Sequence, residues 1–184
     1  MRPMSLHAHA EQYRFELLDA AQQAARLPAP VAAALPARDA LVFAVDDAHS
    51  DTAQFSARYG FGLGDCANTL VLRYKKAGGE HYAAVVSLGD RRLDINGAVK
   101  ARLGAQRLSF AKREDAVALT GMEFGGITAF GLPADWPVLI DEAVMARPHV
   151  VMGAGVRTLK LLLQPDRLRG LAGADIAPLT LAGE

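Results

Sequence analysis

The sequence predicts an α+β domain in which helices pack on a mixed β-sheet. The 184 residues suffice for one substantial core, and predicted strands and short helices alternate irregularly along them. Two strand segments, 69–76 and 81–88, flank a glycine-containing turn, which is typical of a β-hairpin. Hydrophobic residues make up 51 % and charged residues 22 % of the chain, values that fit a globular domain rather than a disordered one.

The N-terminal part is predicted to be helical. We expect residues 1–10 to be frayed, and apolar side chains recur at helical spacing over 11–27. The proline-rich stretch that follows is interpreted as a linker or crossover, because what precedes it cannot form a core by itself. We therefore expect a single domain over 1–184, with an N-terminal helical segment at 11–40 and the core at 40–175.

The remaining elements follow in chain order. We expect a strand at 40–45, a helix at 52–59 capped by Asp51 and ended by Gly60, the hairpin, a short helix at 97–103 capped by Asn96 and stopped by Gly104, a strand at 106–110, a helix at 112–120 ended by Gly121, and strands at 136–141, 149–155 and 158–164. The hairpin and the strands near residues 108, 139, 151 and 161 should share one sheet around a single core.

Several kinds of site find no support in the sequence. The five histidines are dispersed and no cysteine–histidine pattern has zinc spacing, so we expect neither a metal nor a cofactor. No G-x-S-x-G or Walker A pattern is present. The single cysteine, Cys66, is a conceivable nucleophile, but nothing near it in the sequence would lower its pKa. A packed small residue is the simpler interpretation of Cys66.

Location and charge indicate the partners to expect. No apolar run approaches a membrane span, the N-terminus has no secretory h-region, and one cysteine suits the reducing cytoplasm. Residues 71–113 hold ten Lys and Arg against three Asp and Glu, a formal charge of +7. Such a segment suits a polyanion such as RNA, although solvated outer faces of strands and helices would give the same count. The candidate RNA contacts are Lys75, Lys76, Arg91 and Arg92.

The stretch TGMEFGGITAFGLP, residues 120–133, holds four glycines within eleven residues. Glycine permits positive φ and close approach of the backbone to a ligand. A loop of exposed N–H groups can bind an anion or a developing oxyanion without a charged side chain. The alternative interpretation is a tight turn between the helix that ends at Thr120 and the strand near Val138.

This stretch also carries a resemblance to a known family. T-G-x-x-x-G-G-I at 120–127, RLDING at 92–97, LIDE at 139–142 and GAG at 153–155, followed by LKLLL, resemble the YbaK family, which shares its fold with the editing domain of bacterial prolyl-tRNA synthetases. The resemblance covers roughly residues 40–175. It implies a mixed, strongly curved, barrel-like sheet flanked by helices. It also implies deacylation, the hydrolysis of the ester that joins a wrong amino acid to the 3′ end of tRNA.

The resemblance further implies which residues form the site. The family's pocket loop maps onto Gly125, Gly126, Ile127, Thr128 and Ala129, whose backbone amides would face the ester.

Four other positions are implied to contact substrate or hold the loop. They are Asp94, Asp141, Gly153 and Gly155. For the two aspartates, a carboxylate that caps a turn at a strand end is an equally good interpretation.

Two positions depart from the family pattern. Asn68 stands where members commonly carry a lysine, and an asparagine can donate a hydrogen bond but supplies no positive charge. Ala129 stands where the loop commonly ends in proline. Together they indicate a divergent subgroup.

We therefore expect a free-standing deacylase that acts in trans on the 3′ end of aminoacyl-tRNA, with amides of Gly126 to Thr128 meeting the oxyanion and Asn68 beside them. No DNA, membrane or cofactor is expected as a partner, and a synthetase or a second copy of the chain is left open. The alternatives are a binding module that lost hydrolysis with the lysine and a thiol-dependent hydrolase that uses Cys66.

Overall fold

The computed structural model describes residues 4–36 and 38–181. The helices are α1 (Leu6–Gln12), α2 (Ala20–Arg26), α3 (Ala29–Ala34), α4 (Thr52–Tyr59), α5 (Lys100–Leu103), α6 (Arg113–Thr120) and α7 (Glu142–Met145), with 3₁₀ turns η1 (Asp47–His49), η2 (Leu63–Asp65) and η4 (Pro165–Gly170) and a π-helical turn η3 (Ile95–Val99). The strands are β1 (Glu16–Leu17), β2 (Ala40–Ala44), β3 (Ala67–Lys76), β4 (Gly79–Leu88), β5 (Arg92–Leu93), β6 (Arg107–Phe110), β7 (Val138–Asp141), β8 (Val150–Gly153), β9 (Leu159–Leu163), β10 (Ala174–Ala177) and β11 (Thr180–Leu181).

The predicted hairpin is confirmed and forms the middle of a five-stranded sheet. β3 and β4 pair antiparallel from Ala67 opposite Leu88 to Lys76 opposite Gly79. Both turn residues have positive φ, 52° at Ala77 and 77° at Gly78, as in a two-residue turn whose twist matches the strands. The strand order is β10-β7-β4-β3-β6, with β7 parallel to both β4 and β10 and β6 antiparallel to β3.

A second, four-stranded sheet has the order β1-β2-β9-β8 and is antiparallel throughout. The expectation that the strands near 151 and 161 join the hairpin in one sheet is therefore wrong. β9 pairs along its whole length with β2, and one isolated bridge, Cys66 to Val151, links the two sheets. An apolar strand pattern predicts burial but does not specify the pairing partner, which is why the sequence did not reveal the division.

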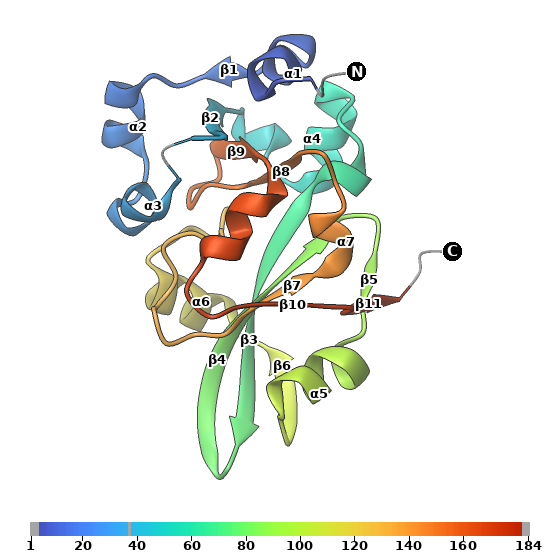
Figure 1. Cartoon of the computed structure of the whole chain (residues 1–184). Coiled ribbons are helices and arrows are strands. Elements are labelled where there is room, and N and C mark those ends of the chain that lie inside the picture. Colours follow the sequence, from blue (N-terminus) through green and yellow to red (C-terminus); the bar gives the residue numbers. More distant parts are fainter. Residues whose placement is uncertain (1–3, 37, 182–184) are drawn as a thin grey trace.

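The described strands form three open sheets, the third being the pair β5 and β11, and none is closed or strongly curled. The mixed α+β architecture is as predicted, but the barrel-like sheet is not supported. In Figure 1 the four-stranded sheet and the N-terminal helices lie at one end of the molecule, and the hairpin turn, α5 and β6 lie at the other.

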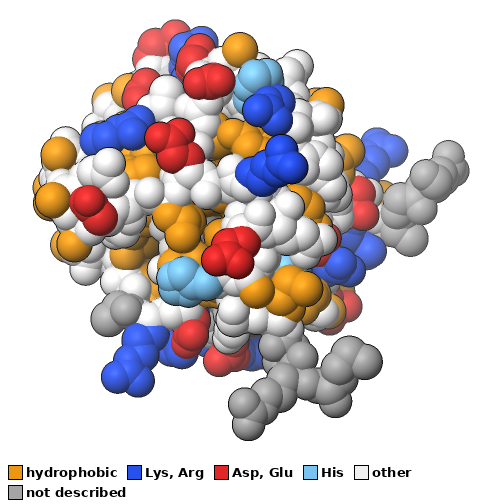
Figure 2. All heavy atoms as spheres, turned by 90° about the horizontal axis from the view of Figure 1, so that it is seen from above, with side chains coloured by type: hydrophobic (Ala, Val, Ile, Leu, Met, Phe, Trp, Pro, Cys, Tyr) orange, Lys and Arg blue, Asp and Glu red, His pale blue; other side chains and the backbone are white. Residues whose placement is uncertain are grey.

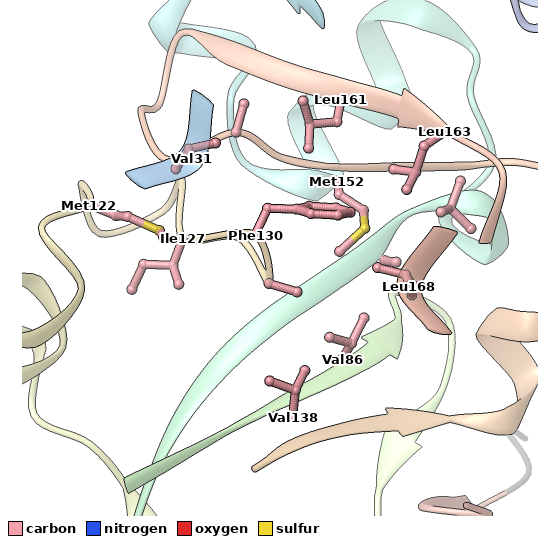
Figure 3. Close-up of a cluster of buried hydrophobic side chains, with 14 of the residues drawn as sticks. Val31, Val86, Met122, Ile127, Phe130, Val138, Met152, Leu161, Leu163 and Leu168 are labelled. Carbon is pink, nitrogen blue, oxygen red and sulfur yellow. The ribbon is translucent and has the colours of Figure 1, made fainter. Parts of the chain in front are cut away.

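One apolar cluster fills the space between the two large sheets. Phe130, only 1 % exposed, lies between Met152 and Leu161 of the four-stranded sheet and Val86 and Val138 of the five-stranded sheet (Figure 3). Phe130 belongs to the glycine-rich stretch. That stretch is thus anchored in the core at one end, which positions the rest of it.

The N-terminal region departs from the prediction of one helix. The segment between α1 and α2 contains β1, which pairs with β2, and Arg14 takes a positive φ of 58°. Phe15 is buried and stacks on Phe43 with ring centroids 4.0 Å apart. Burying this ring against β2 overrides the helical spacing. The expected linker contains α3, and residues 4–10, expected to be frayed, include most of α1, while residues 1–3 lie outside the described part.

Helix ends follow the sequence in most cases. α4 ends at Gly60 and α6 at Gly121, both with the positive φ that a left-handed C-cap requires. The caps differ from the prediction: Asp94, not Asn96, accepts the first amides of the turn at 95–99, and the Asp51 side chain makes no bond to its own helix. The Asp51 carboxylate instead accepts a hydrogen bond from Arg157.

The face over the N-terminal helices carries acidic and basic side chains interspersed with apolar ones (Figure 2). The basic residues of the middle segment, by contrast, lie mainly on β3, β5, β6 and α5. Across residues 4–36 and 38–181, no helix is long and apolar enough to cross a bilayer.

Candidate active site

A cavity of about 300 Å³ lies beside the glycine-rich stretch. Its walls come from segments far apart in the sequence. They are the start of α4 (50–52), the first half of β3 (68–71), the end of β6 (110–111), α6 at Ala116, the glycine-rich stretch at 124, 125 and 127, Gly153 of β8 and Lys160 of β9. The lining is mainly apolar, so the few polar groups that reach it will determine what binds.

Lys160 is the buried cation of this cavity. It is 8 % exposed, and its Nζ donates a hydrogen bond of 2.7 Å to the carbonyl oxygen of Ser50. The same nitrogen lies 5.1 Å from the centre of the Phe55 ring, within the range of a cation–π interaction. Burial lowers the pKa of Lys160 below its ordinary value, because desolvation penalises the charged form. Lys160 was not among the residues predicted from the sequence, although a single charge in the apolar run LKLLL was a signal.

Asn68 lies in the same cavity, on β3. Its Oδ1 accepts a hydrogen bond of 2.8 Å from the hydroxyl of Thr52, at the start of α4. That bond fixes the amide relative to the helix. Asn68 and Lys160 both line the cavity, so a neutral hydrogen-bonding group and a cation share one pocket.

Gly126 packs backbone against backbone. A Cβ at Gly126 would lie 2.6 Å from the carbonyl carbon of Val156, closer than real Cβ atoms come. The Gly126 carbonyl accepts a hydrogen bond of 2.7 Å from the Gly155 amide, and the Gly155 carbonyl accepts one of 2.9 Å from the Glu123 amide. A Cβ at Gly153 would likewise meet the Gly126 carbonyl at 2.8 Å. The glycines therefore allow the stretch to lie against the turn between β8 and β9.

The backbone amides of the glycine-rich stretch differ in whether they already donate a hydrogen bond within the protein. The Gly126 amide donates to the Glu123 carbonyl at 3.0 Å, and the Thr128 amide donates to the Met122 sulfur at 3.4 Å. The amides of Gly125 and Ile127 have no acceptor among the described residues, and both residues line the cavity. The Ala129 amide also has no acceptor in the described part of the chain, but Ala129 does not line the cavity, so Gly125 and Ile127 are the loop members that line the cavity with an unbonded amide.

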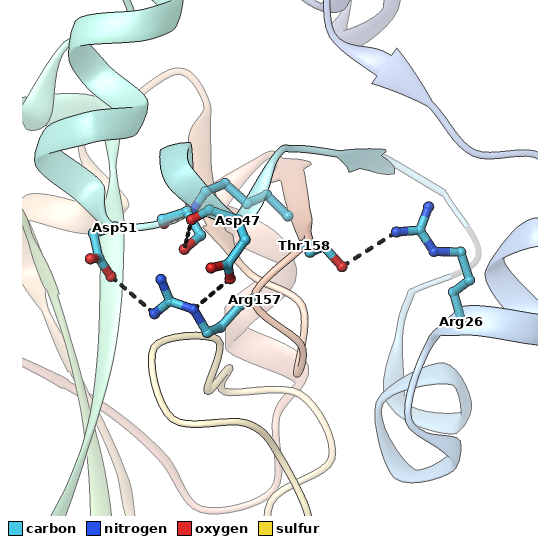
Figure 4. A network of polar contacts seen from close by, with 7 residues as sticks. Arg26, Asp47, Asp51, Arg157 and Thr158 are labelled. Atoms are coloured by element: carbon cyan, nitrogen blue, oxygen red, sulfur yellow. Dashed lines mark hydrogen bonds and ion pairs between the residues drawn. The ribbon is translucent and has the colours of Figure 1, made fainter.

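Arg157 connects the glycine-rich stretch to the opposite wall. Its Nε donates to Asp47 at 2.8 Å and its Nη1 to Asp51 at 3.2 Å, as Figure 4 shows. These bonds raise the pKa of Arg157, the hydrogen bond to Asp47 contributing most. A Cβ at Gly125, whose φ is +88°, would collide with Nη1 of Arg157. The position of the guanidinium therefore depends on glycine at 125.

Cys66 shows no sign of activation. It is buried at the start of β3, its thiol donates to the Gly62 carbonyl at 3.5 Å, and burial raises its pKa to about 12. A thiol with so high a pKa is a poor nucleophile at neutral pH. Within the described residues, no group of three or more His, Cys, Asp or Glu side chains could hold a metal ion.

Comparison with known proteins gives this cavity its context. The sequence model of the family described as "Aminoacyl-tRNA editing domain" matches residues 46–171. The chain belongs to that family. The matched range contains every wall of the cavity, and it agrees with the resemblance seen in the sequence.

Individual relatives of the editing domain are distant. A curated protein of Enterococcus faecalis, EbsC, a proposed Cys-tRNA(Pro)/Cys-tRNA(Cys) deacylase, is 25 % identical over 138 residues, which are 75 % of this chain and 82 % of EbsC. A crystal structure described as a proposed trans-editing enzyme for prolyl-tRNA synthetase matches with a TM-score of 0.67 and 24 % identity, covering 77 % of this chain and 86 % of that one. The hypothetical protein APE2540 matches with a TM-score of 0.67 and 28 % identity, covering 76 % and 90 %.

Four predicted substrate contacts of the editing domain lie outside the cavity lining, namely Asp94, Asp141, Ala129 and Gly155. Asp94 accepts hydrogen bonds from the amides of Gly97 and Ala98, which caps a turn. Asp141, 1 % exposed, accepts from the Leu179 amide and the Thr180 hydroxyl, both at 2.8 Å, and so holds the C-terminal segment. Ala129 is buried in the main core cluster. Asp94 therefore matches the capping interpretation, whereas Asp141 makes no bond to its own helix and binds a distant segment instead.

The four predicted RNA contacts of the editing domain differ in solvent exposure and in whether they bond other groups of the protein. Lys75 and Lys76 are exposed at the end of the hairpin, and Arg92 is exposed on β5. Arg91 donates to the Thr180 hydroxyl at 2.6 Å and lies 3.6 Å from Asp141. Arg91 is therefore part of the anchor of the C-terminal segment.

Proposed function

We propose that this editing domain is a free-standing aminoacyl-tRNA deacylase that acts in trans and hydrolyses the ester of mischarged tRNA. The observation that carries the proposal is the cavity beside the glycine-rich stretch in a chain of the aminoacyl-tRNA editing domain family. At about 300 Å³ the cavity suits one aminoacyl group, since small-molecule pockets start near this size.

The reaction requires no covalent step on a side chain. Water attacks the ester carbonyl carbon, the bond from that carbon to the ribose oxygen breaks, and a proton from the water passes to the ribose oxygen. The products are a free amino acid and an uncharged tRNA end. A terminal ribose hydroxyl next to the ester can orient the water, since Asp51, the carboxylate of the cavity lining, is engaged by Arg157.

Backbone donors would stabilise the tetrahedral oxyanion. We assign this role to the amides of Gly125 and Ile127 rather than to those of Gly126 and Thr128, because the latter two are already bonded within the loop. Preorganised donors of this kind need no rearrangement when charge develops on the oxygen. Gly126, Gly153 and Gly155 would contribute by holding the loop in place.

The decisive assay measures deacylation of a panel of mischarged tRNAs, including Cys-tRNA(Pro) and Cys-tRNA(Cys), by the wild-type chain. Asn68→Ala is the informative variant. It should lower the rate only modestly if Asn68 makes one neutral hydrogen bond, worth about 0.5–1.5 kcal/mol. Failure of the wild type on every substrate would remove the proposal.

The second candidate function is a binding module without hydrolysis. The observation that favours it is Asn68, which supplies no charge at the position where the family commonly has lysine. Such a module would bind an amide-linked aminoacyl-adenosine analogue, yet leave every ester on the panel intact. Measuring probe binding and ester hydrolysis together therefore distinguishes the two candidate functions.

A further inference from the structure

Lys160 is a buried cation without a carboxylate partner. Among the described residues no Asp or Glu oxygen lies within ion-pair distance of its Nζ. The acidic side chain at the same wall is Asp51, which is largely exposed and turned to Arg157. The charge of Lys160 is therefore not neutralised by the protein.

The ammonium group also has donors to spare. A lysine ammonium has three N–H donors, and the structure gives Lys160 one acceptor, the Ser50 carbonyl. The Phe55 ring covers another side at 5.1 Å. Lys160 lines the cavity, so an acceptor placed there can use the remaining donor capacity.

A buried ammonium group without a carboxylate partner lowers the stability of the fold. A buried charge that is not paired destabilises the fold, and apolar side chains of similar shape at buried ionic positions are often neutral or stabilising. β9 is otherwise apolar, with the sequence LKLLL and every residue buried. A lysine in this strand thus works against stability, which points to a role toward a ligand.

We propose that Lys160 is the cationic contact of the site, with its ammonium donating a hydrogen bond to the carbonyl oxygen of the aminoacyl ester. This inference rests on the proposed function and adds a residue to it. Lys160 keeps its proton throughout the reaction. Its charge strengthens the hydrogen bond as the carbonyl oxygen becomes an oxyanion, beside the amides of Gly125 and Ile127.

The test combines binding, turnover and stability in Lys160→Met, a substitution that keeps an unbranched side chain of similar length. An adenosine carrying the amino acid through a 3′-amide serves as the non-hydrolysable probe, measured by calorimetry. We expect affinity for the probe to fall roughly tenfold or more, as for a charged hydrogen bond. Single-turnover deacylation should fall by about 100- to 1000-fold, as when one oxyanion donor is removed. The melting temperature should stay equal or rise.

Arg169→Met is the matched control, because it removes a largely exposed charge on η4, which does not line the cavity. It should change neither binding nor turnover. Unchanged affinity of Lys160→Met for the probe would overturn the inference whether or not the wild type hydrolyses esters, as would a wild type that does not bind the probe. A lower melting temperature with activity reduced in proportion to the folded fraction would indicate a structural lysine and also overturn it. Inactivity of the wild type on the ester panel, with probe binding that depends on Lys160, would overturn only the hydrolytic function.

Discussion

The amide of Gly155 donates a hydrogen bond of 2.7 Å to the carbonyl oxygen of Gly126. With the bond from the Glu123 amide to the Gly155 carbonyl, it joins the glycine-rich stretch to the turn between β8 and β9. This wall of the cavity is therefore built from main chain packed on main chain. This wall keeps its geometry only because Gly126 and Gly155 have no side chain.

Gly126→Val should destabilise the protein as well as abolish deacylation. The added Cβ would lie 2.6 Å from the Val156 carbonyl carbon, and backbone cannot move aside as a flexible side chain can. We expect the free energy of unfolding in urea to fall by about 1–3 kcal/mol or more, the usual range for overpacking.

Gly170→Ala is the matched glycine control for this experiment. Nothing lies within 4 Å of a Cβ at that position, so stability and turnover should be unchanged. A fully stable Gly126→Val protein that lacks only activity would contradict the packing argument. It would instead return the residue to a role in substrate contact.

Arg157→Lys should loosen the cavity without unfolding the chain. A lysine keeps the charge but lacks the planar fork with which Arg157 bonds Asp47 through Nε and Asp51 through Nη1. Because both carboxylates are largely exposed, stability should change by less than about 1 kcal/mol. Hydrogen exchange should instead become faster at residues 47–52 and 123–127, with slower deacylation. Arg147→Lys, which breaks a comparable pair with Asp65, should leave exchange at those two segments as it is.

The stability effect of Lys160→Met should depend on pH. Burial lowers the pKa of Lys160 in the folded chain, so between that value and its ordinary, unfolded value the unfolded state binds more protons. The wild type therefore gains stability as pH rises through this window, and the methionine variant does not. Any advantage of Lys160→Met in urea unfolding should be largest below the folded pKa and shrink as pH rises.

The groups that face Lys160 do not produce this trend. Asp51, Cys66 and Arg157 are the neighbours that affect its pKa, and all three remain in the variant. A stability difference between the two proteins that stays constant with pH would show that Lys160 is not a titrating buried cation.

The double variant Lys75→Glu/Lys76→Glu should weaken tRNA binding. Both lysines are exposed at the end of the hairpin, and phosphate contacts release counterions, so affinity should also depend less steeply on salt. The slope of log affinity against log salt should decrease by about 1 for each phosphate that the variant no longer binds. Arg38→Glu/Arg169→Glu, outside the basic middle segment, is the control. Equal binding by both double variants and the wild type would exclude the hairpin.

The sequence predicted local structure correctly where neighbouring residues determine it. The hairpin was predicted from two strand segments around a glycine-containing turn, although the turn is two residues, shorter than expected, and α6 ends at Gly121 because a left-handed cap favours glycine. The glycine-rich stretch was singled out by its glycines, and the resemblance to the YbaK family assigned it to the candidate site. Asp94 and Asp141 show the limit, because the sequence does not distinguish a strand-end carboxylate that bonds the protein's own backbone from one that contacts a ligand.

The sequence by itself determined the family, which rests on several short motifs, and the hairpin, which rests on two neighbouring segments. Tertiary structure decided the rest. β9 pairs with β2 rather than with the hairpin, and that choice carries Lys160 to the cavity that Asn68 also lines, 110 residues from the Ser50 carbonyl that it bonds. It also decided why Gly126 is glycine, because the atoms that exclude a side chain belong to Val156. Strand partners and close approaches between distant segments come from packing the whole core, which no local pattern encodes.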